Sequence, residues 1–136
     1  MPYDGSNYSN SAFKVALEIA IKFGSKITVV TCLFRPPEEE PFYISEHAKI
    51  VDELKNNAIA ELQKLQKIAA MRKIPVEIRV MSCSSVVEIL TTFVNTNKVD
   101  LIVMGTRGKT GFKPLLLGSV SIGVSQYASC PTLLVK

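Results

Sequence analysis

The sequence predicts an α/β fold in which a parallel, doubly wound sheet carries helices on both faces. Helical and strand patterns alternate along the whole chain of 136 residues. Such alternation favours parallel strands joined by right-handed crossovers. Most of the strand patterns are continuous apolar runs, which are typical of strands buried on both faces. The chain shows no second domain and no internal repeat, so we expect one domain over residues 1–136.

The N-terminal part of the pattern begins with a helix over Ser9–Phe23, where apolar residues recur at three- and four-residue spacing. Ser9 and Ser11 are candidate N-caps, the asparagines and serines from Ser6 to Ser11 are expected to cap this helix, and Gly24 is a natural stop. Ile27–Phe34 is an apolar and β-branched run of strand length. Arg35–Pro41 holds three prolines and three glutamates, so we expect an exposed loop there.

The C-terminal part continues the same alternation of helical stripes and short apolar runs. The expected elements are helix His47–Met71, strand Val76–Met81, helix Val86–Asn95, strand Leu101–Met104, helix Ser119–Ala128 and strand Thr132–Val135.

The start of the chain leaves little room for a first strand. Only Met1 to Tyr3 precede the turn Asp4-Gly5-Ser6. Three extended residues span only about 10 Å, which is short for an ordinary strand. We therefore expect a truncated first strand. It is either a stub or the end of a strand whose upstream residues are absent from this chain, and we favour the second interpretation.

Composition excludes several functional classes. The chain is 47% apolar and 21% charged, like ordinary globular proteins, and no apolar run reaches the roughly 18 residues of a membrane span. The three cysteines, Cys32, Cys83 and Cys130, show no metal-ligand spacing, so we expect reduced thiols and a cytoplasmic protein. The net charge of +4 is spread along the chain, which argues against a nucleic-acid partner.

A glycine-containing stretch after a buried strand predicts an anion site. Gly105 ends the apolar run, Gly108 follows, and Gly118-Ser119 opens a helix. Glycines let the backbone turn sharply and bring N–H groups close to a phosphate. The helix start adds unpaired N–H groups and the positive end of the helix dipole. The stretch therefore predicts a phosphorylated ligand, and a nucleotide is the ligand that we favour.

At this point the chain resembles the universal stress protein family over essentially its whole length. The family pattern of glycine, two residues, glycine, nine residues, glycine and serine or threonine matches at Gly105, Gly108, Gly118 and Ser119. The resemblance implies an open, parallel, five-stranded doubly wound sheet with helices on both faces. This sheet is of the Rossmann-like, adenine nucleotide alpha hydrolase-like type, here with a truncated first strand. The resemblance also implies ATP or a related adenine nucleotide, AMP or ADP, at the carboxyl ends of the strands, and a homodimer through the last strand.

The resemblance assigns roles to the candidate residues, and plainer roles stand beside several of them. Asp4 would accept ribose hydroxyls or reach a nucleotide-bound Mg²⁺, or else form an Asx turn. Arg107 and Lys109 would neutralise phosphates or remain solvated loop charges, and Ser121 would contact phosphate or face solvent. The candidate nucleotide-binding residues are Pro2, Tyr3, Asp4, Val30, which would meet adenine through its backbone, Gly105, Thr106, Arg107, Gly108, Lys109, Gly118, Ser119, Val120 and Ser121.

These features predict an ATP-binding stress-response module without strong catalysis. The chain has no Walker-type lysine motif and only one histidine, His47, which lacks a paired nucleophile. We assign His47 to a structural or surface position, the acidic run Glu38–Glu40 to a solvated loop, and Cys83 to an exposed loop. The alternatives are a slow ATP hydrolase or nucleotidyl-transfer enzyme on the same scaffold, and a nucleotide-free dimeric scaffold.

Overall fold

The computed structural model describes residues 1–34, 44–109 and 117–136. The expected loop at Arg35–Pro41 and the acidic run within it lie outside the described residues. The predicted order of helices and strands is confirmed, with most boundaries within three residues of those expected. The elements are α1 (Asn7–Phe23), β1 (Ile27–Phe34), α2 (Ile44–Met71), β2 (Val76–Cys83), α3 (Val86–Thr96), β3 (Ile102–Gly105), α4 (Ser119–Tyr127) and β4 (Thr132–Val135).

The expectation of one five-stranded sheet is wrong for the residues that the structure describes. They form two parallel two-stranded sheets, β1 with β2 and β3 with β4. The start of the chain adds only an isolated parallel bridge between Pro2 and Val30. Three residues are too short to pair along both neighbouring strands, so the two sheets lie side by side without a complete strand between them. A cavity of about 330 Å³ lies there, lined by both sheets and by α1 and α3.

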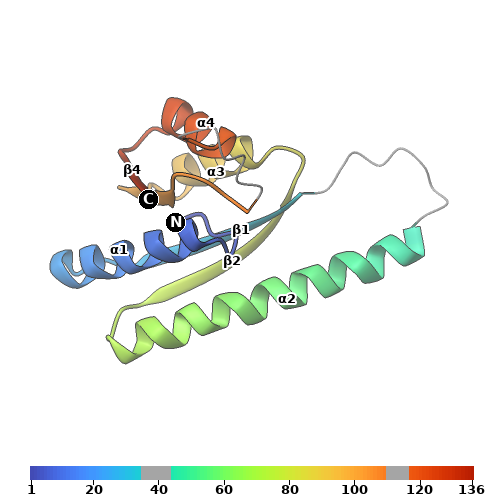
Figure 1. Ribbon diagram of the computed structural model, residues 1–136, viewed down its shortest axis with the longest axis horizontal. Helices are drawn as coiled ribbons and strands as arrows, with labels where there is room; N and C mark the ends of the chain where they lie inside the picture. The colour runs from blue at the N-terminus through green and yellow to red at the C-terminus, as the bar shows by residue number, and fades with distance from the viewer. Residues whose placement is uncertain (35–43, 110–116) are drawn as a thin grey trace.

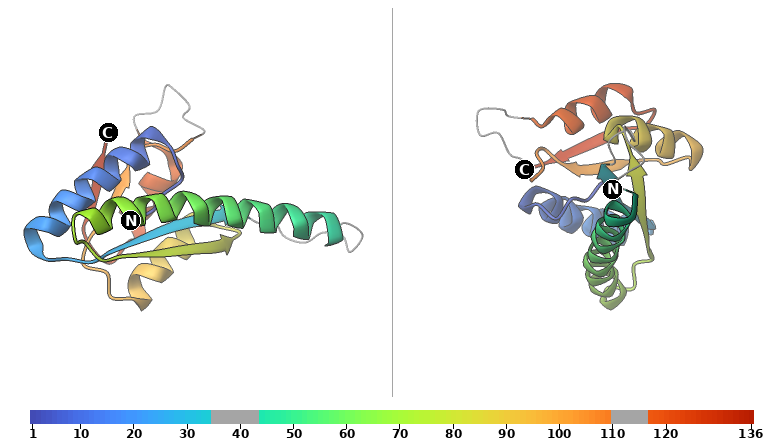
Figure 2. Two further views of the ribbon diagram at one scale, coloured as in Figure 1. Left: turned by 90° about the horizontal axis from the view of Figure 1, so that it is seen from below. Right: turned by 90° about the vertical axis from the view of Figure 1, so that its right-hand side faces the viewer.

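Helices cover both sides of these sheets, as predicted. α1 and α2 lie on one side, and α3 and α4 lie on the other (Figure 1). The right-hand view of Figure 2 shows the same layers, and its left-hand view shows the N-terminal half of α2 projecting past the strands. None of the helices within the described ranges is both long and apolar enough to cross a membrane.

Successive residues of the central strands point into two separate apolar clusters. Val29 and Val103 pack with α1 and α2, whereas their neighbours Val30 and Ile102 pack with α3 and α4. This split follows from the two-residue side-chain period of a strand. Both clusters contain fully buried residues, such as Leu62 of α2. The continuous apolar runs of β1 and β3 therefore reflect burial on both faces, as the sequence predicted.

Capping side chains position the helices that approach the candidate site. Ser6, rather than Ser9 or Ser11, is the N-cap of α1, and its hydroxyl accepts the Ser9 N–H. Ser85 caps α3 in the same way through the Glu88 N–H. Gly24 ends α1 in the left-handed conformation with φ +63°, as expected of a glycine stop.

Candidate functional site

A cleft of about 280 Å³ opens at the carboxyl ends of β1 and β3. This is where open α/β folds bind ligands. The cleft gathers residues from the start of the chain, the segment after β3 and the start of α4, which are far apart in sequence. Every residue of the sequence-predicted set lines it except Thr106. Thr106 is buried and bridges two elements instead, because its N–H donates to Val135 O and its carbonyl accepts the Gly118 N–H.

Asp4 connects the start of the chain to the glycine segment. Its Oδ1 accepts the Ser6 N–H at 3.0 Å, and its Oδ2 accepts the Lys109 N–H at 2.9 Å. Burial acts to raise the pKa of Asp4, but hydrogen bonds from Ser6, Ser9 and Lys109 outweigh it and hold the pKa below its usual value. Asp4 is therefore an ionised carboxylate at neutral pH, and it fixes the position of the backbone after β3.

Two of the three motif glycines are required by close contacts. A Cβ on Gly105 would lie 2.7 Å from the Tyr8 Cβ and 3.1 Å from the Ser9 nitrogen. A Cβ on Gly108 would lie 2.7 Å from the Asp4 Oδ2. At Gly118, by contrast, the nearest atom would be 3.4 Å away, which is ordinary contact. The missing side chain of Gly105 therefore leaves room for the first turn of α1, and that of Gly108 leaves room for the Asp4 carboxylate.

The start of α4 presents backbone donors at the cleft. No side chain of the described residues caps this helix, and the first N–H groups of any helix lack intrahelical partners. Ser119 and Val120 line the cleft here. Ser121 is buried and its hydroxyl donates to Gly105 O at 2.9 Å, so its placement as a solvated helix residue is wrong. This bond ties α4 to the end of β3.

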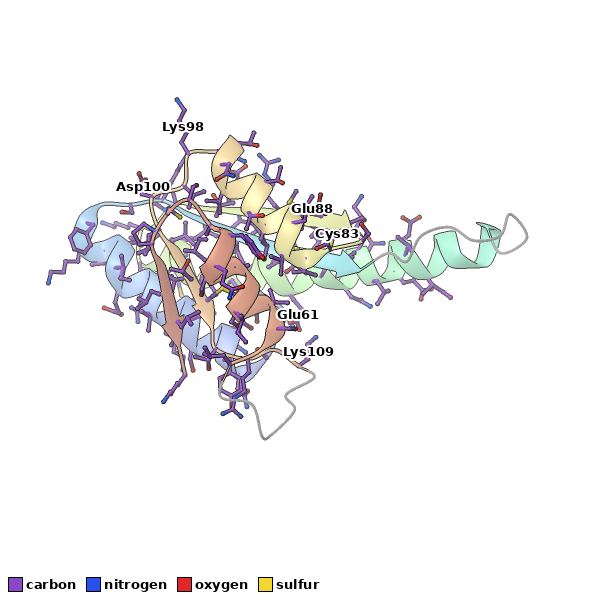
Figure 3. All side chains as sticks on the ribbon, turned by 90° about the horizontal axis from the view of Figure 1, so that it is seen from above. Glu61, Cys83, Glu88, Lys98, Asp100 and Lys109 are labelled. Atoms are coloured by element: carbon purple, nitrogen blue, oxygen red, sulfur yellow. The ribbon has the colours of Figure 1, made fainter. Side chains whose placement is uncertain are left out.

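Arg107 supplies a positive charge whose donors are incompletely used. Its guanidinium lies over the Tyr8 ring, 5.4 Å from the centroid, in a cation–π arrangement. Its Nε is buried and has no hydrogen-bond partner among the described residues. A buried donor of this kind is costly unless a ligand or water satisfies it. Lys109, also on the cleft, carries the second cation of the segment and lies near Glu61 of α2 (Figure 3).

The N-terminal residues form the wall of the cleft that lies along β1. Tyr3 N–H donates to Val30 O, and Val30 N–H donates to Met1 O, so both backbone groups of Val30 are already paired. The Thr31 hydroxyl also donates to Tyr3 O at 2.8 Å. Backbone groups two residues apart on a strand point to the same side. Cys32, which lines the cleft one step beyond the bridge, therefore presents backbone groups that Val30 cannot offer.

Sequence reasoning missed five residues that line the cleft and misplaced another residue nearby. The apolar walls of the cleft come from β1, β3 and α3. Among these residues, only Cys32 had a signal in the sequence, because it lies two residues after Val30 on β1 and therefore on the same face of the strand. Cys83 does not lie in an exposed loop: it is the last residue of β2 and is buried. The missed residues are Ser9, Cys32, Val86, Leu90 and Met104.

The described lining of the cleft combines polar and apolar groups. Backbone N–H donors, serine hydroxyls, the Asp4 carboxylate and the cations of Arg107 and Lys109 lie against apolar walls from β1, β3 and α3. Within the described residues no three His, Cys, Asp or Glu side chains converge as metal ligands. The three cysteines are unbridged. Asp4 uses one lone pair of each oxygen for backbone donors, and a carboxylate has further acceptor capacity for a sugar hydroxyl or a phosphate-bound cation.

Comparison with known proteins decides the family. The model of the universal stress protein family matches residues 1–136. The chain belongs to the universal stress protein family. A universal stress protein of Methanocaldococcus jannaschii is 34% identical over 136 residues, covering 100% of this chain and 79% of that protein.

Solved universal stress protein structures share the fold. UspA from Lactobacillus plantarum superposes with a TM-score of 0.92 at 18% identity, covering 99% of this chain and 94% of that one. A universal stress protein in complex with cAMP superposes with a TM-score of 0.71 at 24% identity, covering 99% of this chain and 92% of that one. These similarities establish the universal stress protein fold for this chain.

Proposed function

We propose that this protein binds an adenine nucleotide, ATP being the ligand favoured, and acts as a binding and signalling module rather than as an efficient catalyst. The observation that carries the proposal is the cleft itself. It brings an ionised Asp4, the backbone after β3, the uncapped start of α4 and the unsatisfied Nε of Arg107 to one place. Such donors and cations suit phosphate oxygens.

The shape of the cleft orients the proposed ligand. The phosphates face the start of α4 and Arg107, because the donors lie there. The ribose hydroxyls face Asp4, which has acceptor capacity left. The base occupies the apolar side between Cys32 and Leu90, where the backbone groups of Cys32 supply polar contacts. The volume of about 280 Å³ lies near the lower end of the range for small-molecule sites, so the outer phosphates extend beyond it. The solved relative with cAMP supports an adenine nucleotide as the ligand class.

Calorimetry with ATP, ADP, AMP and cAMP tests the proposal, together with mass spectrometry of any small molecule released from the denatured protein. Gly118→Val places a branched side chain at the start of α4, where the fold has ordinary contact distances. We expect this variant to fold and to lose nucleotide binding. Ala60→Val, which adds a branched side chain at an exposed position of α2 outside the cleft, is the matched control. Full affinity in Gly118→Val would show that the site lies elsewhere.

The rival function, a nucleotide hydrolase, makes an opposite kinetic prediction. Phosphoryl transfer needs a positioned base and a metal clamp, and among the described residues that line the cleft Asp4 is the one carboxylate. We therefore expect phosphate release with ATP and Mg²⁺ far slower than about 1 s⁻¹, the lower end of ordinary enzyme rates. Turnover well above that rate would favour the enzyme.

We also propose that two copies associate through β4. This strand pairs with β3 on one side, and Leu133 on it is 39% exposed. Sheet edges of this kind are commonly paired, and two-fold pairing is the commonest solution. Light scattering should give a dimer that Leu133→Lys weakens, whereas a monomeric wild-type protein would refute the proposal.

A further inference from the structure

Three sulfur-bearing side chains meet on the sheet face that packs against α3. Residues of β1 and β2 pair in parallel register, with Cys32 opposite Met81 and Phe34 opposite Cys83. Paired residues, and residues two apart on a strand, project to the same face of a sheet. Cys32, Met81 and Cys83 therefore share one face, and Cys32 and Met81 pack against the same apolar cluster as α3 and α4.

The two thiols are diagonal neighbours on this face, because Cys83 lies two residues beyond the partner of Cys32. Burial, and then the neighbouring Cys83 thiol, raises the pKa of Cys32 to about 12. Cys83 is 8% exposed at the end of β2, beside the start of α3 (Figure 3). Cys32 borders the cleft, which gives a path from solvent to the pair. Neither thiol lies at the start of α4 or beside Arg107, where the phosphates of the proposed nucleotide would bind.

The strand geometry disfavours a disulfide between them. Cys83 lies two residues beyond the direct partner of Cys32. Strands about 4.8 Å apart with a rise of about 3.3 Å per residue put such diagonal Cα atoms about 8 Å apart. A disulfide needs Cα atoms closer than about 7 Å unless the backbone moves. A metal ion between the sulfurs removes this difficulty, because bonds of about 2.3 Å on opposite sides of one ion hold two thiolates about 4.6 Å apart.

We propose that Cys32 and Cys83, with the thioether of Met81 beside them, form a binding site for one copper(I) ion. Thiolate and thioether ligands select this soft cation. Structural zinc requires four ligands, and the part of the chain that the structure describes offers no cluster of three His, Cys, Asp or Glu. As the two sulfur–copper bonds form, each thiol releases its proton to solvent, and no electron is transferred. The site is independent of the nucleotide proposal.

The test is a titration of the reduced full-length chain with copper(I) held by a weaker chelator, without oxygen, with native mass spectrometry to count bound ions. We expect one ion per chain, and loss of that complex in Cys32→Ser and in Cys83→Ser. Met81→Leu should weaken binding by roughly tenfold, as loss of a supporting contact does. Cys130→Ser is the matched control, because Cys130 lies outside the trio, next to β4, and should leave binding unchanged.

Thermal melts of the metal-free variants show whether a variant has lost only a copper-binding sulfur or its whole fold. If the buried hydroxyl of Cys83→Ser prevents folding, Cys83→Ala replaces it. A one-to-one complex that survives in Cys32→Ser, or that disappears in Cys130→Ser, would overturn the assignment. So would the absence of any stoichiometric complex in the wild-type chain. A Cys32–Cys83 disulfide formed rapidly with a small disulfide oxidant would refute the spacing argument and with it the preference for a metal.

Discussion

Gly105→Ala should destabilise the protein even though the residue sits in a nucleotide-binding motif. The added Cβ would lie 2.7 Å from the Tyr8 Cβ, 2.8 Å from the Tyr8 carbonyl carbon and 3.1 Å from the Ser9 nitrogen. Favourable contact between carbon atoms begins near 3.5 Å. Two of these three atoms are backbone atoms, so relief requires the first turn of α1 to move away from the end of β3.

Overpacking of this kind costs about 1–3 kcal/mol. Replacing glycine by alanine also restricts the unfolded chain, which offsets about 0.4–1 kcal/mol. A net loss of about 1.3 kcal/mol corresponds to a fall in Tm of about 5 °C for a chain of this length, from the unfolding entropy per residue. In Gly118→Ala the entropic gain is the same, but the added Cβ lies 3.4 Å from its nearest atom. The difference in melting temperature between the two variants therefore measures the cost of the close contacts at Gly105.

Calorimetric melting of wild type, Gly105→Ala and Gly118→Ala measures that difference. We expect Gly118→Ala to melt within about 2 °C of wild type, since surface changes without a clash cost little. Equal melting temperatures for the two variants would refute the packing role of Gly105. A larger fall in melting temperature for Gly118→Ala than for Gly105→Ala would show that α1 does not approach β3 as closely as described.

Three further outcomes follow from the contacts of the cleft. Asp4→Asn should lower stability by at most about 1 kcal/mol at pH 7, because Asp4 is exposed. Since its folded pKa is depressed, this difference should shrink as the pH falls through that pKa, as melts at stepped pH would show. Ser121→Ala removes a buried donor from Gly105 O and should cost about 1–3 kcal/mol in denaturant unfolding, with Ser125→Ala for comparison. Arg107→Gln should weaken ATP binding about tenfold by calorimetry, whereas Arg72→Gln, an exposed cation paired with Glu18, should leave it unchanged.

The helices and strands were predictable because each depends on local periodicity. The run Ile27–Phe34 was assigned with the boundaries of β1 because continuous apolar and β-branched residues leave few alternatives. The N-cap of α1 was narrowed only to the serines and asparagines of Ser6–Ser11, because several of them satisfy the same local rule and only the fold selects Ser6. The single five-stranded sheet failed for a different reason. Sheet continuity depends on pairing between distant segments, and the first three residues supply only one bridge to Val30.

The candidate site was predictable to the extent that its residues follow strands. The carboxyl ends of parallel strands lie at one edge of a sheet. Asp4 follows the first extended residues and the glycine segment follows β3, so both were expected at that edge. The pairing state of each backbone group was not accessible from the sequence. Val30 was chosen for a backbone contact, but the start of the chain occupies both of its backbone groups. Cys83 was placed in a loop because the strand was expected to end at Met81, and two more paired residues bury it.

Asp4 determines how ligand binding and the fold depend on each other. Its two oxygens already accept the Ser6 and Lys109 N–H groups, and further lone pairs remain for ribose hydroxyls. A nucleotide therefore need not break the link between the start of the chain and the segment after β3. It adds contacts to both partners of that link, and a ligand that binds the folded state alone stabilises it by mass action. Nucleotide binding at the proposed site should consequently tighten the Asp4–Lys109 connection rather than release it.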